Sequence, residues 1–205
     1  MRETTRVLVA SRNAKKLREL HRVLAAAGVD GIELVGLDAV PEYPEAPETG
    51  ATFEENALAK ARDGAAATGM PCVADDSGIE VDALNGMPGV LSARWAGAHG
   101  NDPANTALVL AQLGDVPDDR RGAAFVSACA LVVPGGEESV VRGEWRGSIA
   151  REPVGDGGFG YDPVFVPDGD TRSAAQLSPE EKDASSHRGR ALVQLVPDLA
   201  ALTGH

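Results

Sequence analysis

Hydrophobic and polar positions in the first third of the chain form blocks that predict strand, helix and strand. Residues 5–10 are apolar and β-branched, and a helical period that Gly28 closes follows at Leu17, Leu20, Val23, Leu24 and Ala27. A second strand is predicted over 32–35, before a proline-rich acidic loop over 41–50. Thr52 and Glu55 have the spacing of a capping box, which predicts an alanine-rich helix ending near Gly69.

The rest of the pattern adds further strands and three helices. Residues 71–76 and 79–84 are predicted as two separate strands, and Asp102 and Pro103 as the N-cap and first position of a helix that continues to Gly114. The other predicted elements are a hairpin of 123–133 and 139–149 around Pro134-Gly135-Gly136, a strand over 163–166, a helix capped by Ser178 with Glu181, and a terminal helix over 190–202. The predicted fold class is therefore α/β with a mixed sheet.

Length and charge narrow the possible functions. With 205 residues, 43% of them hydrophobic, the chain can bury a core as one domain or as two lobes that share a sheet. We expect a single domain over residues 1–205 without an independent linker. The formal net charge of -12 repels polyanions, so a nucleic-acid polymer is not an expected partner. A small anionic ligand would need a local group of basic residues or a metal ion.

The cysteines and the amino-terminal segment indicate a reducing compartment. Cys72 and Cys129 lie in apolar stretches, where cysteine usually behaves as a small buried hydrophobe, and a disulfide or a metal pair is the alternative. The apolar run over 7–10 is too short for a signal peptide or a membrane span. We expect a cytoplasmic protein without a membrane partner.

Two adjacent carboxylates, Asp75 and Asp76, follow the apolar run over 70–73 and precede Ser77 and Gly78. A strand that ends in acids can hold a hard cation in a cleft and activate water. Asp followed by Ser-Gly is also ordinary turn chemistry, and taken alone the motif favours a turn. The choice depends on what accompanies these acids elsewhere in the chain.

A basic segment, Ser11-Arg12-Asn13-Ala14-Lys15-Lys16, lies between a predicted strand and a predicted helix. Free backbone N–H groups and the positive end of the helix dipole favour a phosphate at such a position. The segment is neither a Walker A loop nor a dinucleotide-binding turn, because both glycine patterns are absent. It predicts a seat for a triphosphate, with ordinary solvated lysines as the alternative.

Magnesium prefers one or two carboxylates together with phosphate oxygens, which suits one loop glutamate, Glu48, and one strand aspartate. Glu54 and Glu55 are better explained as acids that stabilise the first turn of a helix. Phe159 lies in the glycine-rich segment over 155–162, where a flat base could stack on its ring, or the ring could fill the core.

Ser186-His187-Arg188-Gly189 supplies several hydrogen-bond donors near a predicted helix start. Donors from His187 or Arg188 that face a 6-keto oxygen would reject the amino group of adenine. Guanine also has a 6-keto oxygen, so nothing in the sequence identifies how GTP is rejected. A simple surface pair is the alternative for these two residues.

Together these segments resemble the inosine/xanthosine triphosphate pyrophosphatase family, which clears deaminated purine nucleotides. The resemblance covers residues 7–195 in six ordered blocks: 11–16, 48–50 with 52–57, 74–78, 88–90 with 92–95, 158–162, and 181–182 through 186–189. The family commonly has glycine after the first hydroxyl residue of its phosphate loop, whereas this chain has Arg12.

The resemblance implies an elongated two-lobed α/β fold with a central mixed twisted sheet, a nucleotide cleft between the lobes, and a homodimer. It implies magnesium-dependent hydrolysis of ITP, dITP and XTP to monophosphate and pyrophosphate. Asp76 would be the catalytic base and a metal ligand, with Glu48 as the second ligand. The implied substrate-binding residues are Ser11, Arg12, Asn13, Ala14, Lys15, Lys16, Ser77, Phe159, Gly160, Tyr161, Asp162, Lys182, His187 and Arg188.

Two other functions compete with this interpretation. Phosphomonoester hydrolysis through an aspartyl nucleophile would need a D-x-D spacing, which is missing at Asp75-Asp76. A nucleotide sensor that binds without turnover would not need the acids that accompany the basic segment. Release of orthophosphate would favour the first alternative, and binding without any product would favour the second.

Overall fold

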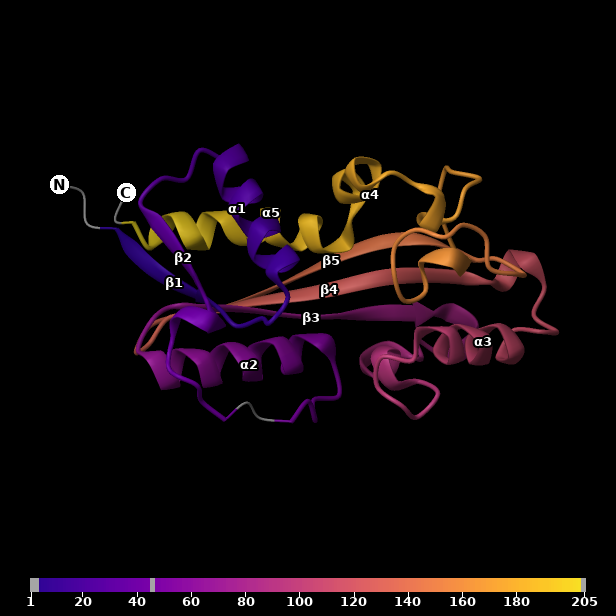
Figure 1. Cartoon of the computed structure of the whole chain (residues 1–205), viewed down its shortest axis with the longest axis horizontal. Helices are drawn as coiled ribbons and strands as arrows, with labels where there is room; N and C mark the ends of the chain where they lie inside the picture. Colours follow the sequence, from indigo (N-terminus) through magenta and orange to yellow (C-terminus); the bar gives the residue numbers. More distant parts are fainter. Residues whose placement is uncertain (1–3, 45–46, 204–205) are drawn as a thin grey trace. The chain divides into compact units, whose positions relative to one another are not determined.

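The amino-terminal segment forms the predicted strand, helix and strand (Figure 1) in the computed structural model, which describes residues 4–44 and 47–203. Residues 45 and 46 of the predicted acidic loop lie outside the described residues. β1 (Thr5–Val9) pairs in parallel with β2 (Ile32–Gly36), and α1 (Ala14–Ala26) connects them. The hydrophobic period of α1 buries Leu20 and Leu24, which confirms the predicted face.

The capping residue predicted for the second helix is also correct. α2 (Phe53–Thr68) begins after Thr52, whose hydroxyl accepts a 3.1 Å hydrogen bond from the Glu55 backbone N–H. The Glu55 carboxylate reaches back to the Ala51 N–H at 2.6 Å, one residue earlier than in a regular capping box. The helix ends at Gly69, which has the left-handed φ of 68° that glycine tolerates.

One long strand, β3 (Cys72–Val81), replaces the two strands predicted over 71–76 and 79–84, so that prediction is wrong. Asp75 and Asp76 lie inside this strand and not at its end. β3 lies between β1 and β4 in the sheet, but its pairing with β1 ends at Val73. The sheet context of β3 beside β4 therefore outweighs the local turn preference of Asp-Ser-Gly. Residues 82–84 instead form a single 3-10 turn.

The helix after β3 starts one residue earlier than predicted. α3 spans Asp102–Gln112, and its N-cap is Asn101, whose side chain accepts a hydrogen bond from the Ala104 N–H at 3.3 Å. Asp102 is thereby free of the capping role and accepts a hydrogen bond from Gly160 instead, at 2.8 Å.

The carboxyl-terminal half follows the predicted order. β4 (Gly122–Val132) and β5 (Glu138–Ile149) flank the predicted hairpin turn, and β6 (Phe165–Pro167) follows the glycine-rich segment. A complete capping box, in which Ser178 and Glu181 bond each other's backbone N–H, opens α4 (Pro179–Ser185). α5 (His187–Ala201) begins three residues before the predicted helix over 190–202. The 3-10 turns are Leu37–Ala39, Asp82–Leu84, Gly89–Arg94, Asp118–Arg120, Asp162–Val164 and Ala174–Gln176.

The six strands form one sheet in the order β2-β1-β3-β4-β5-β6. β1 pairs in parallel with β2 and β3, whereas β5 and β6 are antiparallel. The mixed sheet and the α/β class are therefore confirmed.

The described residues divide into two compact units. Unit 1 comprises the chain up to Asp76, Ser127–Gly143 and everything from Arg188, and unit 2 comprises Ser77–Val126 and Glu144–His187. The chain passes from one unit to the other inside β3, β4 and β5 and at the first peptide of α5. Each passage therefore lies within a regular element.

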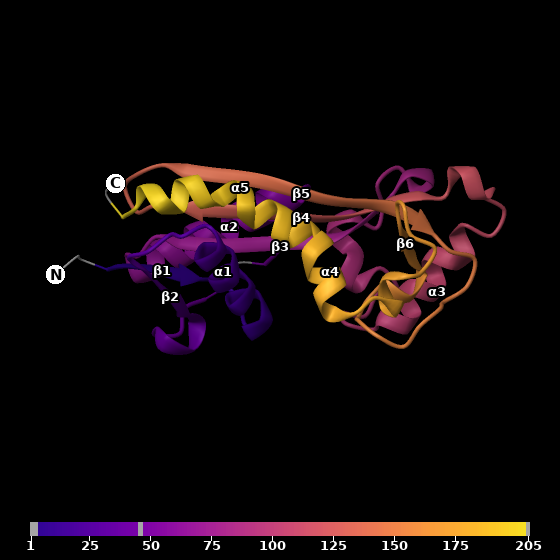
Figure 2. The same cartoon turned by 90° about the horizontal axis from the view of Figure 1, so that it is seen from above.

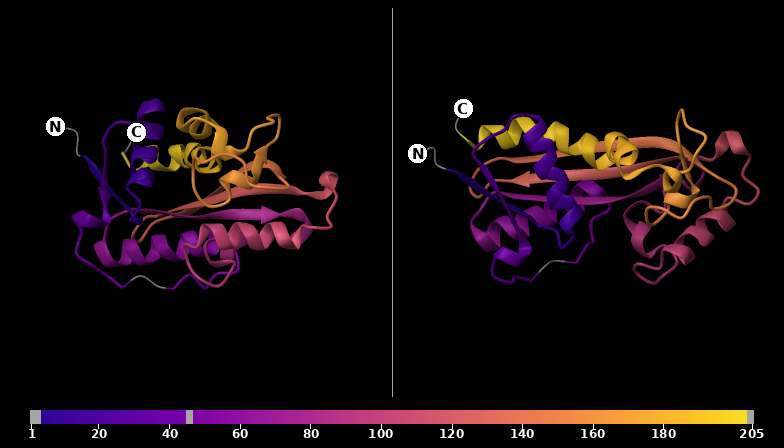
Figure 3. Two further views of the ribbon diagram at one scale, coloured as in Figure 1. Left: turned by 45° about the vertical axis from the view of Figure 1, so that its right-hand side comes forward. Right: turned by 45° about the horizontal axis from the view of Figure 1, so that its top comes forward.

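In unit 1, α1 and α5 lie on one face of the sheet and α2 lies on the other (Figures 1 and 3). α5 runs along the strands (Figure 2) and packs Leu192 and Leu195 into a core that contains Cys129 of β4. On the α2 face, a Cβ added to Gly64 would lie 2.5 Å from the Cys72 sulfur, so only glycine fits there without a shift of its neighbours. Cys72 and Cys129 are both buried and free, as predicted.

Unit 2 has an aromatic core. The ring centroids of Phe125 and Phe165 are 4.6 Å apart, and those of Trp145 and Phe165 are 5.4 Å apart. Val109 of α3 and Leu113, the C-cap residue of that helix, pack against this cluster. Within residues 4–44 and 47–203, no helix is long and apolar enough to cross a membrane.

Candidate active site

The topology at the end of β1 creates a candidate ligand position in unit 1. β1 stops at Val9, opposite Val73 of β3, while β3 continues past Asp75 and Asp76. From β1 the chain passes through α1 to β2 on one side, and α2 then leads to β3 on the other. In α/β sheets, ligands bind at the carboxyl ends of the strands where the connections change direction in this way.

The predicted phosphate-binding segment follows directly. The Ser11 hydroxyl accepts a 3.1 Å hydrogen bond from the Asn13 N–H, and Asn13 caps α1 by accepting one from the Lys15 N–H at 2.9 Å. Residues 12–15 are exposed, and Lys16 is partly buried. All six predicted residues therefore gather at the amino end of α1, which favours an anion.

Asp75 faces α1 and α5. Its Oδ2 atom lies 2.8 Å from Nζ of Lys16 and 3.0 Å from Nε of Arg188, and a second nitrogen of Arg188 lies 3.6 Å from a carboxylate oxygen of Glu19. Burial alone would raise the pKa of Asp75, but the charges of Lys16 and Arg188 outweigh it and hold that pKa well below its ordinary value. The Asp75 carboxylate is therefore ionised and forms ion pairs with Lys16 and Arg188.

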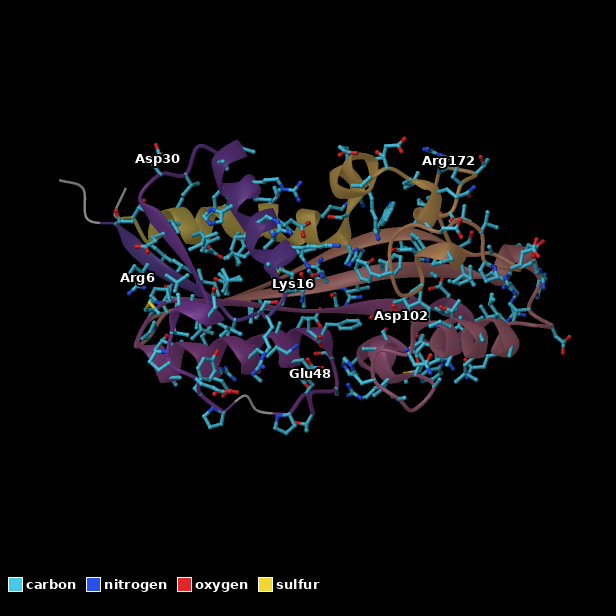
Figure 4. The ribbon with its side chains drawn as sticks, viewed as in Figure 1. Arg6, Lys16, Asp30, Glu48, Asp102 and Arg172 are labelled. Atoms are coloured by element: carbon cyan, nitrogen blue, oxygen red, sulfur yellow. The ribbon has the colours of Figure 1, made fainter. Side chains whose placement is uncertain are left out.

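Asp76 faces α2, because successive side chains of a strand point to opposite faces. Its Oδ2 accepts a 2.9 Å hydrogen bond from the amide of Asn56, and its Oδ1 lies 3.4 Å from Nζ of Lys60. The same ammonium contacts Oε1 of Glu48. Figure 4 labels Lys16 and Glu48, which lie on the two sides of β3. Glu48 and Asp76 thus converge on a single cation.

Burial and neighbouring charges shift the pKa values of Asp76 and Lys60. Burial raises the pKa of Asp76 above its ordinary value, against the opposing effect of the Lys60 charge. Burial would lower the pKa of Lys60, but Asp76 and Glu48 outweigh it and raise that pKa. A cavity of about 300 Å³ adjoins the group and is lined by Glu48, Asn56 and Lys60 among others. The arrangement can hold one cation and orient a proton acceptor beside it.

Unit 2 carries the predicted base-binding segment. The Phe159 side chain is 65% exposed, which rules out the alternative in which its ring fills the core. The Lys182 ammonium lies 4.7 Å from the centre of that ring and also contacts the buried carboxylate of Asp162. Asp162 in turn accepts a 2.7 Å hydrogen bond from the Phe159 N–H. An aromatic face and an ammonium donor are therefore presented together.

Other side chains of unit 2 fix the backbone of the same segment. Asp102 accepts from the Gly160 N–H at 2.8 Å, and Thr106 donates to the Gly160 carbonyl at 3.3 Å. Tyr161 is buried and donates from its hydroxyl to the Ser92 carbonyl at 2.8 Å. The exposed ring of Phe159 thus stands on a segment whose peptides are held in place.

The structure distributes the other predicted residues in ways that the sequence pattern did not indicate. The His187 ring stacks on Phe125 of unit 2, with centroids 5.3 Å apart, whereas Arg188 pairs with Asp75 in unit 1. Arg12 lines a cavity of about 270 Å³ with residues from 37 to 43. Ser77 is the first residue of unit 2, directly after Asp76.

Sequence reasoning missed Asn56 and Lys60, the two α2 residues that contact Asp76. Their spacing of four places them on one face of a helix, which was a usable signal. Nothing local, however, indicated that this face would meet Asp76, because the contact joins residues far apart in the chain.

Comparison with known proteins identifies what the chain is similar to. The sequence profile of the Ham1 family matches residues 7–198. A dITP/XTP pyrophosphatase of Nocardia farcinica is 77% identical over 96% of this chain and 96% of its own, and one of Mycobacterium tuberculosis is 71% identical over 97% of each. A crystal structure of a nucleoside-triphosphatase, also described as a dITP/XTP pyrophosphatase, from Mycobacterium abscessus is 70% identical, with a TM-score of 0.83 over 95% of this chain and 100% of that one. A HAM1 protein of Coxiella burnetii is 41% identical, with a TM-score of 0.86 over 97% and 100%.

Proposed function

This chain belongs to the Ham1 family, and from that membership we propose that it hydrolyses the deaminated purine nucleoside triphosphates ITP, dITP and XTP to monophosphate and pyrophosphate, which removes them from the nucleotide pool. The observation that carries the proposal is that Glu48 and Asp76 both contact one cation, the Lys60 ammonium. Asp75, the residue before Asp76, contacts Lys16 of the proposed phosphate-binding segment.

We propose that Lys16 and the amino terminus of α1 bind the phosphates. The segment 11–16 lies at a helix amino terminus, where the positive end of the helix dipole favours anions. Arg12 and Lys15 add two more positive charges to the exposed part of this segment. In a protein of net charge -12, a local excess of positive charge is needed for a polyphosphate to approach.

Magnesium fits the carboxylate pair. Glu48 and Asp76 both contact the Lys60 ammonium, so their carboxylates can reach one cation. Two carboxylates with phosphate oxygens are a usual magnesium environment. Within the described residues no group of three or more His, Cys, Asp or Glu side chains could hold a metal alone, so phosphate oxygens and water would complete the shell. When bound, magnesium would neutralise charge on the triphosphate.

Asp76 is the proposed proton acceptor. Asn56 fixes one of its oxygens at 2.9 Å and leaves the other directed toward the cation position. In the metal-free protein, burial raises the pKa of Asp76 above its ordinary value. Asp76 would take a proton from the water that attacks the α-phosphorus, while the bond from the α-phosphorus to the bridging oxygen breaks and pyrophosphate leaves.

In unit 2, the proposed contacts with the base are made by Phe159 and Lys182. The exposed ring offers a stacking face, and the ammonium can donate to a 6-keto oxygen but has no acceptor for a 6-amino group. Tyr161 and Asp162 are buried, so we assign them to holding Phe159 and Lys182. His187 and Arg188 stay predictions as direct contacts with the base.

The test is one assay of ITP, XTP, GTP and ATP with and without magnesium that follows monophosphate and pyrophosphate together. We expect ITP and XTP to be converted with equal yields of both products, only with the divalent cation, and much faster than ATP. Equal turnover of ATP and ITP would contradict keto recognition, and release of orthophosphate would contradict the reaction itself.

Two further proposals concern the setting of the enzyme. We propose that it works in the cytoplasm, where the nucleotide pool lies, and that it is a homodimer. Light scattering of the purified protein tests the second proposal, since a monomer mass would exclude it.

A further inference from the structure

A lysine side chain lies where a metal ion would be expected. Lys60 projects from α2 with its Nζ atom in contact with Oε1 of Glu48 and 3.4 Å from Oδ1 of Asp76. The three residues come from a loop, a helix and a strand of unit 1. Asn56, one helical turn before Lys60, donates to the other oxygen of Asp76 at 2.9 Å. The ammonium is thus the cation on which both carboxylates converge.

This group is partly withdrawn from water. The exposed side-chain fractions are 26% for Lys60, 35% for Glu48 and 12% for Asp76. Two carboxylates that approach one point in such surroundings repel each other unless a positive charge lies between them. Lys60 provides that charge within the polypeptide, so the carboxylates can stay close together before any metal arrives.

An ammonium and a divalent ion cannot share this position. Magnesium requires oxygen ligands at about 2.0–2.1 Å, which leaves no room for a nitrogen between the carboxylates. The two cations would also repel each other strongly at such a distance. Lys60 has a long flexible stem, and the adjoining cavity of about 300 Å³ gives its head group space to move.

We propose that Lys60 is a resident cation of the Glu48–Asp76 pair, which keeps the carboxylates together in the free protein and must be displaced before a divalent ion binds. The proposal rests on the proposed metal site. Displacement opposes metal binding, so the protein without nucleotide binds the metal weakly. Lys60 therefore sets the metal affinity through its charge, besides any contact that it makes with substrate.

The test measures Mn²⁺ binding to nucleotide-free protein by electron paramagnetic resonance. Lys60→Met removes the resident charge, and Arg62→Met is the matched control, because Arg62 lies on the same helix and pairs with the exposed Glu138. We expect Lys60→Met to bind Mn²⁺ at least about tenfold more tightly than the wild type, since removing one positive charge beside a divalent ion is worth that much or more. Arg62→Met and Lys60→Arg should resemble the wild type.

Equal or weaker Mn²⁺ binding by Lys60→Met would overturn the proposal. If this variant is poorly folded without metal, the rise of its Tm on adding Mg²⁺ gives the same comparison, and a rise no larger than that of the wild type would also overturn it. Failure of the proposed function would be seen separately, as wild-type turnover of ITP that needs no divalent cation.

Discussion

Nζ of Lys16 lies 2.8 Å from Oδ2 of Asp75, so this lysine at the amino end of α1 is held by a strand carboxylate that is 9% exposed. Arg188 contacts the same oxygen from α5. The carboxylate therefore joins α1, β3 and α5 on one face of unit 1 and fixes the direction of the Lys16 side chain. Its neighbour Asp76 faces α2, so the two adjacent acids have separate partners.

Asp75→Asn should destabilise the protein, because it leaves Lys16 and Arg188 without the charge that they share. Breaking a buried ion pair in this way costs about 3 kcal/mol in the free energy of unfolding. Urea denaturation measures the change, and Glu138→Gln, which breaks only the exposed pair with Arg62, should leave the midpoint nearly unchanged. A variant at position 75 as stable as the wild type would contradict this role.

Acid should weaken the same network. The pKa of Asp75 in the folded protein lies below its ordinary value of about 4, because Lys16 and Arg188 outweigh the effect of burial. The contribution of the Asp75 charge to the free energy of unfolding is therefore complete above that ordinary pKa. It is lost as the pH falls toward the pKa of Asp75 in the folded protein. Between about pH 5 and about pH 3, the wild type should lose more free energy of unfolding than Asp75→Asn does. Parallel pH profiles for the two proteins would argue against the assignment.

Removing the exposed ring should weaken substrate binding without unfolding the protein. Phe159→Ala should raise KM for ITP by about 5- to 150-fold, since stacking of a base on an aromatic ring is worth about 1–3 kcal/mol. The Tm should hardly change, because 65% of the Phe159 side chain is exposed. Phe159→Tyr keeps the stacking face and should stay close to the wild type. An unchanged KM in the alanine variant would remove Phe159 from the site.

The hydrogen bonds that α3 makes to Gly160 should matter for binding and not for chemistry. Thr106→Val removes the donor that lies 3.3 Å from the Gly160 carbonyl, and we expect a KM about 2- to 10-fold higher with kcat unchanged. Asp102→Ala should act in the same direction, while Asp102→Asn keeps an acceptor for the Gly160 N–H and should restore much of the affinity. A fall in kcat alone would contradict this positioning role.

The two cysteines should not react in the folded protein. Both are buried, and burial raises the pKa of Cys72 and of Cys129 to about 12, so very little thiolate exists at neutral pH. A thiol reagent should label neither cysteine in native conditions and both in denaturant. Rapid labelling of the native protein would show that one of these packed strands opens.

Elements with local signals were predictable from the sequence. The capping residues Thr52 and Ser178 fixed the starts of α2 and α4, because a side chain and a backbone N–H three residues apart form the bond regardless of the rest of the fold. The hairpin between β4 and β5 also follows from its turn residues. Asn101 displaced Asp102 as an N-cap because both side chains suit that position, and Gly160 engages Asp102.

What depends on distant pairing was not predictable. Asp75 to Gly78 have turn preferences, yet the sheet context beside β4 keeps them inside β3. The alternation of β3 then decides that Asp75 meets Lys16 while Asp76 meets Lys60, and a one-residue change in register would exchange these partners. Many candidate residues of the site could therefore be named from the sequence, but Asn56, Lys60 and the partners of the two aspartates could not.

The central claim is that water attacks the α-phosphorus of a purine triphosphate beside Glu48 and Asp76. Hydrolysis of ITP in ¹⁸O-labelled water, with the products separated and weighed by mass spectrometry, tests it most directly. The account predicts one ¹⁸O atom in the monophosphate and none in pyrophosphate, with both products strongly reduced in Asp76→Asn. Label in pyrophosphate or orthophosphate, or near-normal turnover by Asp76→Asn at saturating magnesium, would contradict it.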